Sequence, residues 1–158
     1  MAASPRLITT ISPSAFQKTR RPAAITARRS STYRRSRNPL QTFWIAVADL
    51  SFISLKIVLP SIKSLIKANR SELLVLVKPQ FEVGKDLVGK GGVVRDHSLH
   101  AEAIKGVANE SKKSGWYPKG LIASPLKGPA GNQEYLLWMG DKNEENIEIE
   151  KLLNVLFF

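Results

Sequence analysis

Short apolar runs divide the second part of the chain into strands. The runs Phe43–Ala48 (FWIAVA) and Glu72–Val77 (ELLVLV) are apolar at successive positions, and polar residues or prolines bound them. Continuous runs of this length are typical of parallel strands covered by helices on both faces. Two further runs, Leu121–Ala123 and Glu134–Met139 (EYLLWM), predict a third and a fourth strand.

Helical spacing of apolar residues fills the intervals between these runs. Residues 54–59 predict a short helix, and Pro60 suits the first position of a renewed helix. Asp96 is a good N-cap for a helix over about 98–114, and Gly115 is expected to end it.

The order of elements is strand, helix, strand, helix, strand, strand, helix, with the last helix over about 144–156. The loop Ser124–Gln133 between the last two strands is too short for a crossover helix, so these strands are expected to be antiparallel. This order predicts an α/β domain over residues 43–158: the C-terminal portion of a doubly wound sheet, ending in an antiparallel hairpin. Trp138 alternates with apolar neighbours and is predicted to lie in the core.

Composition sets residues 1–42 apart from this domain. Nine of the 24 Lys and Arg residues, and none of the 13 Asp and Glu residues, precede Asp49. The segment is also rich in Ser and Thr and is interrupted by prolines, so we interpret it as a disordered organelle transit peptide. Its MAAS start and its lack of a long apolar core favour a plastid address, with the mitochondrion second. The alternative is a basic tail that binds RNA phosphates.

Several classes of site are excluded or disfavoured. The chain has no cysteine, which excludes disulfides, thiolate metal sites and cysteine nucleophiles. No stretch approaches the roughly 20 apolar residues that span a bilayer, so we expect a soluble protein without a membrane partner. His97 and His100 lack an evident third ligand, and we predict no metal site. The P-loop-like stretch Gly84–Gly91 ends in glycine where a hydroxyl residue should hold magnesium. We interpret it as a mobile substrate loop, with an ordinary solvated loop as the alternative.

Three charged residues are expected at one edge of the sheet. Asp49 and Lys78 each follow a parallel strand, and ligands of open α/β sheets bind beyond such strand ends. Glu134 begins the antiparallel strand, which starts at that same edge. A desolvated lysine oriented by carboxylates can abstract a proton or steer a hydroxyl. The alternative is an ion-pair cluster without a catalytic role.

Three stretches carry a resemblance to a known family. Asp49–Pro60 (DLSFISLKIVLP), Val77–Asp96 (VKPQFEVGKDLVGKGGVVRD) and Ser124–Leu137 (SPLKGPAGNQEYLL) closely resemble the hemolysin A (TlyA) branch of the FtsJ-like RNA methyltransferases. The resemblance covers roughly residues 45–140. It implies a Rossmann-like sheet and methyl transfer from S-adenosylmethionine to a ribose 2′-hydroxyl, usually of ribosomal RNA.

The resemblance also assigns roles to residues. The family uses a Lys-Asp-Lys-Glu tetrad, whose aspartate, second lysine and glutamate match Asp49, Lys78 and Glu134. Asp49 is therefore also the expected contact to the methyl donor. Basic residues of the adjoining loops are the expected contacts to RNA phosphates: Lys85, Lys90, Arg95 and Lys127.

The chain also departs from the family pattern. The family's first lysine and glycine-rich donor loop lie upstream of the aspartate, where this chain carries the transit-like segment. A truncated, non-catalytic fragment, which binds RNA or a partner chain but not the donor, is therefore the alternative function. Because these first strands are missing, the edge of strand 43–48 is expected to be unpaired and to favour self-association.

Overall fold

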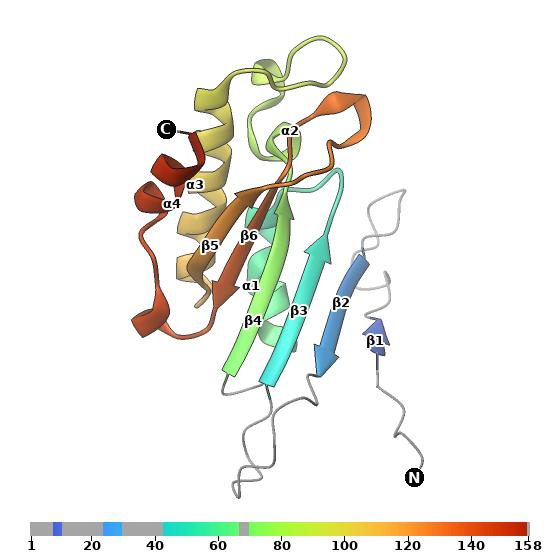
Figure 1. Ribbon diagram of the computed structural model, residues 1–158. Coiled ribbons are helices and arrows are strands. Elements are labelled where there is room, and N and C mark those ends of the chain that lie inside the picture. The colour runs from blue at the N-terminus through green and yellow to red at the C-terminus, as the bar shows by residue number, and fades with distance from the viewer. Residues whose placement is uncertain (1–7, 11–23, 30–42, 67–69, 158) are drawn as a thin grey trace, which may run out of the picture.

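The computed structural model describes residues 8–10, 24–29, 43–66 and 70–157 (Figure 1). The strands of the described residues form one sheet in the order β1-β2-β3-β4-β6-β5. Strands β3 and β4 are parallel, and β6 is antiparallel to both β4 and β5, which confirms the predicted hairpin. The strands are β1 (Ile8–Thr10), β2 (Ala24–Arg29), β3 (Phe43–Asp49), β4 (Arg70–Val77), β5 (Tyr117–Ala123) and β6 (Tyr135–Gly140).

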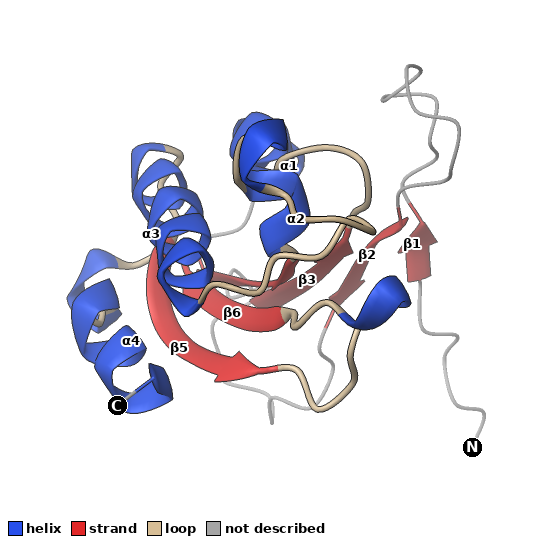
Figure 2. Ribbon diagram, turned by 90° about the horizontal axis from the view of Figure 1, so that it is seen from above, coloured by secondary structure: helices blue, strands red, loops and turns tan. Residues whose placement is uncertain are grey.

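Helices cover one face of the sheet. The α-helices are α1 (Leu55–Leu65), α2 (Pro79–Glu82), α3 (His97–Lys113) and α4 (Ile149–Phe157). Figure 2 shows α1, α2 and α3 on the same side of the sheet, with α4 beside α3 and β5. Short 3₁₀ turns lie at Lys85–Leu87 (η2), Pro129–Gly131 (η3) and Asn143–Glu145 (η4). Within the described ranges, no helix combines the length and the apolar character needed to cross a bilayer.

Alternate strand residues form the core beneath these helices. The inward positions of β3, β4 and β6 are buried, as period-two side-chain alternation requires. They pack against Trp116 and against one face of α1, α3 and α4. The inward residues are Ala46, Ala48, Leu73, Val75, Val77, Tyr135, Leu137 and Met139.

Helix α1 is continuous through Pro60, so the prediction of a helix renewed at this residue is wrong. Proline removes one backbone hydrogen bond within the helix. Burial of the apolar stripe Leu55, Val58, Leu59 and Ile62 offsets this loss. Ser54 caps the helix by accepting a hydrogen bond from the backbone N–H of Lys56 at 3.2 Å.

Helix α3 has the ends that the sequence predicts. Asp96 is its N-cap and accepts a hydrogen bond from the backbone N–H of Ser98 at 2.8 Å. Gly115 follows the helix at a φ of 75°, a left-handed conformation that glycine adopts at little cost. Trp116 is then fully buried, so it packs in the core rather than offering a surface to RNA bases.

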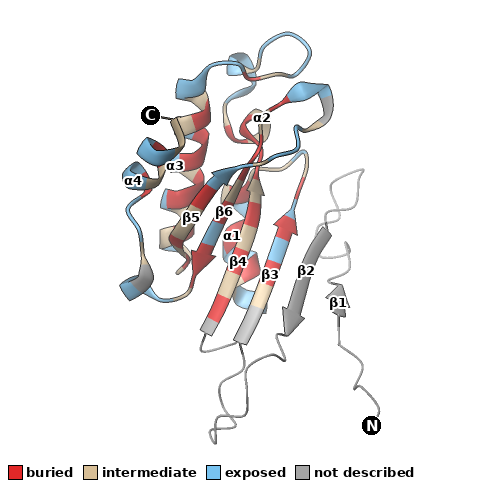
Figure 3. Cartoon of the chain, in the orientation of Figure 1, coloured by how far each residue is buried: buried red, intermediate tan, exposed pale blue. Residues whose placement is uncertain are grey.

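The opposite face of the sheet carries apolar residues that no described helix covers (Figure 3). Val47, Ile122 and Trp138 are 41%, 57% and 39% exposed. The predicted core position of Trp138 is therefore wrong, because alternation directs its side chain away from the helical layer. The expectation of helices on both faces is not met within the described part of the chain.

Strand β2 pairs with the edge of the sheet that was expected to be open. It runs antiparallel to β3, with Ala24 opposite Asp49 and Arg29 opposite Trp44. Ile25 and Thr26 suit an extended strand, and the free backbone groups of β3 provide its partner. The prediction of an unpaired β3 edge is therefore wrong, and self-association stays a prediction.

The pairing of β2 with β3 places part of segment 1–42, which was predicted to be disordered, in the sheet. Residues 8–10 and 24–29 are strands in the structure, which differs from that prediction for these positions. The rest of 1–42 lies outside the described residues. The boundary between segments 1–42 and 43–158 stays a prediction.

Candidate active site

An ion pair links the carboxyl ends of β3 and β4. Asp49 is the last residue of β3, and Lys78 directly follows β4. Lys78 Nζ lies 2.7 Å from Asp49 Oδ1 and donates a hydrogen bond to Ser51 Oγ at 3.0 Å. The lysine side chain is only 10% exposed, whereas that of Asp49 is 59% exposed. The amine is therefore held firmly at the end of a buried strand, and the carboxylate faces solvent.

Glu134 approaches the same edge from the antiparallel strand. Val77 pairs with Tyr135, so Lys78 and Glu134 are the next residues beyond this pair on adjacent strands. Glu134 is buried, and its Oε1 has no hydrogen-bond partner among the described residues. Topology thus brings Asp49, Lys78 and Glu134 together, as predicted from their positions at strand ends.

The environment of Glu134 shifts its protonation equilibrium. Burial raises the pKa of the Glu134 carboxyl, and the positive charge of Lys78 partly opposes that shift. The negative charge of Asp49 raises the pKa, and a hydrogen bond from the Gln80 side chain lowers it. The buried carboxyl therefore holds its proton more tightly than a glutamate in water.

Glu134→Gln is expected to make the protein more stable than the wild type at neutral pH. The pKa of Glu134 is raised above 4.5 in the folded chain, so the protonated carboxyl favours the folded state. This stabilisation is fully present below pH 4.5 and is lost as the pH rises through the folded pKa. Glutamine removes this loss, so the difference in unfolding free energy should shrink as the pH falls toward 4.5. Urea unfolding at several pH values measures it. A variant less stable than the wild type at pH 7 would contradict the burial of an ionised carboxylate.

A second buried carboxylate, that of Glu82, connects the segment that follows Lys78 to the segment that follows Asp49. Glu82, at the end of α2, accepts hydrogen bonds from the backbone N–H of Leu55 at 2.7 Å and from Ser54 Oγ at 2.6 Å. Burial raises the pKa of Glu82, and the hydrogen bonds from Ser54 and Leu55 oppose this. Its negative charge at the N-terminus of α1 also suits the helix dipole. Glu82 thereby ties α2 to the start of α1.

Glu82→Ala is expected to lower the free energy of unfolding by about 2 kcal/mol, because it leaves a buried N–H without a partner. Glu110→Ala is the control, since its side chain pairs with Lys113, which is 72% exposed. Such a surface pair contributes less than about 0.5 kcal/mol. Denaturant melts compare the two variants. Equal decreases in the free energy of unfolding would show that the hydrogen bonds of Glu82 stabilise the protein no more than a surface ion pair does.

Two loops border the site and are tied together. Asn132 is buried, donates a hydrogen bond to the Gly92 carbonyl at 2.8 Å and accepts one from the Val94 N–H at 3.1 Å. The glycine-bearing loop over 84–95 is thereby fixed to the loop over 124–134 that presents Glu134. In Figure 1 both loops lie at the end of the molecule where β3 and β4 end. The predicted RNA contacts on these loops are all exposed: Lys85, Lys90, Arg95 and Lys127.

Three neighbours of the site were not singled out from the sequence: Ser51, Gln80 and Gly128. Gly128 packs so closely on Glu134 that a Cβ atom there would lie 2.8 Å from Glu134 Cδ and would collide with Oε1. Ser51 lies two residues after Asp49, and Gln80 lies two residues after Lys78. This spacing was the one feature of the sequence that could have placed them near the site. The contact of Gly128 depends on the path of its loop, which no sequence pattern indicated.

Two aromatic residues also lie beside the site. Phe52 has a φ of 64°, which is unusual for a residue with a side chain, and it is 61% exposed. Its ring lies 5.1 Å from the ring of Phe81. Backbone strain of this kind often occurs at functional sites. The exposed ring of Phe52 thus packs against a half-buried Phe81, next to the turns that follow Asp49 and Lys78.

The two histidines have separate roles in the structure. His97 is exposed, and His100 is buried, where its Nδ1 contacts the Tyr135 hydroxyl at 2.7 Å and its Nε2 the Val94 carbonyl at 2.9 Å. Burial raises the pKa of Tyr135 to about 12, so the phenol keeps its proton. Within the described ranges, no three His, Cys, Asp or Glu side chains gather in a way that could hold a metal ion.

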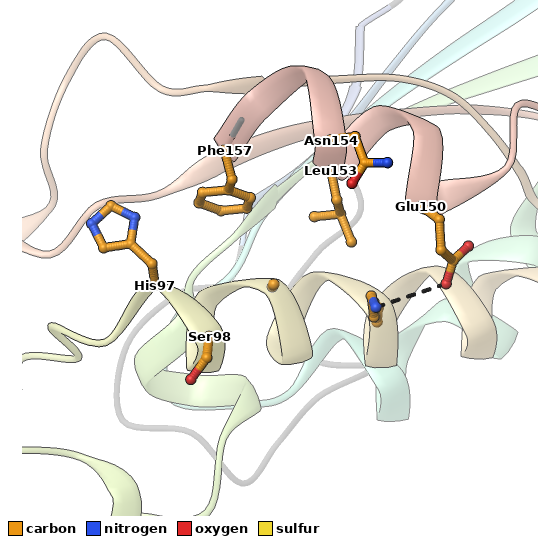
Figure 4. Close-up of a pocket in the computed structure, with 8 residues that line it drawn as sticks. His97, Ser98, Glu150, Leu153, Asn154 and Phe157 are labelled. Carbon is orange, nitrogen blue, oxygen red and sulfur yellow. Dashed lines mark ion pairs between the residues drawn. The ribbon is translucent and has the colours of Figure 1, made fainter.

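A pocket of about 350 Å³ lies apart from these residues, between α3 and α4 (Figure 4). Ala101, Leu153 and Phe157 are among its apolar lining residues. Lys105 Nζ and Glu150 Oε1 face each other across it at 3.9 Å. It contains none of the three strand-end residues, so its position does not suggest a part in their chemistry.

Comparison with known proteins identifies the family. The family model described as FtsJ-like methyltransferase matches residues 9–141, more than half of the chain. The chain belongs to the FtsJ-like methyltransferase family. The match includes all three strand-end residues and begins within the segment that was interpreted as a transit peptide.

Individual relatives refine this assignment. The 16S/23S rRNA (cytidine-2′-O)-methyltransferase TlyA of Mycobacterium tuberculosis is 45% identical over 108 residues, which cover 68% of this chain and 40% of TlyA. YqxC of Bacillus subtilis, named as a candidate rRNA methyltransferase, is 41% identical over 115 residues, which cover 70% of this chain and 41% of YqxC. The chain therefore spans about 40% of the length of these curated relatives.

A solved structure shows the same fold. The crystal structure of a protein from Lactococcus lactis, described as a candidate hemolysin, matches with a TM-score of 0.63 and 36% sequence identity. The match covers 70% of this chain and 54% of that one. The predicted α/β methyltransferase fold is thus confirmed.

Proposed function

We propose that this protein transfers a methyl group from S-adenosylmethionine to a ribose 2′-hydroxyl of ribosomal RNA. The observation that carries the proposal is the Lys78 amine, which is buried, paired with Asp49 at 2.7 Å and adjacent in register to Glu134. Membership of the FtsJ-like family and the rRNA 2′-O-methyltransferase activity for which TlyA is named support the substrate class.

The chemistry of the site concerns the acceptor hydroxyl. A ribose 2′-hydroxyl is a weak nucleophile until a base removes or withdraws its proton. Lys78 Nζ would contact this hydroxyl, orient its lone pair and accept its proton as the methyl group is transferred. Asp49 holds the amine and stabilises its charged form, and the buried Glu134 adds negative charge behind it.

The described residues fit the methyl donor only in part. S-adenosylmethionine would supply an electrophilic methyl group, and Asp49 is the exposed carboxylate at the strand edge where the family places this donor. The first glycine of the chain is Gly84, so no glycine-rich turn precedes Asp49. The steps proposed for this chain are therefore confined to the hydroxyl that receives the methyl group.

The surroundings of the site suit RNA. Lys85, Lys90 and Arg95 are exposed on one bordering loop, and Lys127 on the other, where they would contact phosphates. The exposed ring of Phe52, which packs against the half-buried ring of Phe81, would stack on an unpaired base next to the target ribose. Such a surface selects single-stranded or splayed nucleotides rather than a regular duplex.

Transfer of a labelled methyl group to ribosomal RNA tests the proposed function. The protein is incubated with labelled S-adenosylmethionine and either bacterial-type ribosomal RNA or DNA of the same sequence. Label should enter the RNA and not the DNA, because DNA lacks the 2′-hydroxyl. Label in both, or in neither, would contradict the proposal.

The second candidate is a chain that binds RNA or a partner chain but not the donor. The observation that raises this candidate is that residues 1–83 of this sequence contain no glycine. Calorimetry with S-adenosylmethionine separates the two candidates. Saturable micromolar binding would eliminate the second candidate, and no heat of binding would eliminate the first.

We further propose that the protein acts in plastids, with mitochondria as the second location. The support is compositional, since nine basic residues and no acidic ones precede Asp49. Fusion of residues 1–42 to a fluorescent protein tests the address. Fluorescence that stays diffuse in the cytosol of plant cells would contradict it.

A further inference from the structure

The hydroxyl of Ser51 is the second partner of the Lys78 amine. Lys78 Nζ donates to Ser51 Oγ at 3.0 Å and lies 2.7 Å from Asp49 Oδ1. Ser51 is half-buried in the turn between β3 and α1, where the next residue, Phe52, has a φ of 64°. The turn is therefore held in an unusual conformation that directs a hydroxyl at the amine.

Two fixed acceptors leave one direction open on the lysine nitrogen. An ammonium group has three N–H donors in a tetrahedral arrangement, and a neutral amine has two N–H donors and one lone pair. When Asp49 and Ser51 accept two of the hydrogens, the third position is the one that can meet another molecule. In the neutral amine this third position is the lone pair.

We propose that Ser51 is a positioning residue, which fixes the reactive direction of the Lys78 amine toward the substrate hydroxyl. The inference rests on the proposed function, because it concerns the same lysine and the same acceptor. With Asp49 alone as a partner, the amine could rotate about its terminal bond, and its lone pair would face the substrate only part of the time. Ser51 removes that freedom before the RNA binds.

A neighbouring serine shows what a purely structural hydroxyl looks like in the same turn. Ser54 Oγ donates to the Glu82 carboxylate at 2.6 Å and accepts from the Lys56 N–H at 3.2 Å. Among the described residues, Lys78 is the hydrogen-bond partner of the Ser51 hydroxyl. Ser51 therefore contributes less to the hydrogen bonding of α1 and is connected directly to the amine.

Three variants test the proposal through kinetics. Ser51→Ala is expected to lower kcat about tenfold, which corresponds to about 1.4 kcal/mol, while KM changes less than about twofold. Ser51→Thr retains the hydroxyl and should recover kcat to within about threefold of the wild type. Ser54→Ala should reduce stability to urea with a smaller effect on kcat than Ser51→Ala. Unchanged kcat in Ser51→Ala, or no recovery in Ser51→Thr, would overturn the proposal.

A spectroscopic readout separates this inference from the proposed function. In protein carrying isotopically labelled lysine, NMR detects ammonium groups whose protons exchange slowly with water, and Lys78→Met identifies the Lys78 signal. Exchange at Lys78 should accelerate several-fold in Ser51→Ala and stay slow in Ser51→Thr and Ser54→Ala. This result is decisive even if no methyl transfer is detected. Equal exchange rates in wild type and Ser51→Ala would overturn the positioning role.

Discussion

Lys78→Met is expected to slow methyl transfer about a thousandfold, because it removes the group that we propose contacts the substrate hydroxyl. Methionine retains most of the buried stem of the lysine. Asp49, whose side chain is 59% exposed, stays hydrated after this change, and the buried Glu134 loses the positive charge that lowers its pKa, so it takes up a proton more readily. The free energy of unfolding should therefore change by less than about 1 kcal/mol.

Lys113→Met is the matched control for this prediction. Lys113 is 72% exposed and forms a surface ion pair with Glu110. Its replacement should leave both the rate and the stability close to wild-type values. Rates and urea melts of the two variants separate a role in catalysis from a role in folding. A Lys78→Met protein that unfolds normally and transfers methyl groups at the wild-type rate would remove Lys78 from the mechanism.

Gly128→Ala is expected to lower the rate about a hundredfold, because a methyl group at this position displaces the Glu134 carboxylate. The backbone of Gly128, with φ of −68° and ψ of 174°, accommodates alanine without strain. The collision with Glu134 is thus the main consequence of the change. Stability should fall by about 1–2 kcal/mol, as in other overpacked buried positions.

Gly84→Ala is a closely matched control. Gly84 also precedes a short 3₁₀ turn, with φ of −59° and ψ of 150°, and an added Cβ there would meet nothing within 4 Å. Alanine at such a position stabilises a protein by about 0.4–1 kcal/mol or leaves it unchanged. Comparable rates for the two alanine variants would show that the position of Glu134 does not affect the reaction.

The sequence predicted correctly that three charged residues lie at one edge of the sheet, because topology alone determines their positions. Asp49 ends β3, Lys78 follows the adjacent parallel strand β4, and Glu134 directly precedes the antiparallel β6, so strand order is sufficient to bring them together. The apolar runs that carried this prediction are strong signals, because buried strands tolerate few polar residues. The helix cap at Asp96 and the stop at Gly115 were equally clear, since each reflects local backbone geometry.

Features that depend on loop paths or on the other side of the sheet could not be predicted. The contact between Gly128 and Glu134, and the direction of the Ser51 hydroxyl, arise from turns without periodic patterns. Trp138 occupies one of the alternating positions of its strand, as predicted, yet periodicity does not indicate which face of the sheet the helices cover. Strand β2 lies in an arginine-rich segment whose composition suggested disorder, although its backbone pairs with β3.

The most direct test of the central claim is to identify the atom that receives the methyl group. Ribosomal RNA treated with the protein and labelled S-adenosylmethionine is digested to nucleosides, which are then separated and analysed by mass spectrometry. Because we propose that Lys78, Asp49 and Glu134 act on a ribose hydroxyl, the label should appear in a 2′-O-methylated nucleoside and disappear with Lys78→Met. Label on a base, or the absence of any methylated nucleoside, would contradict this account.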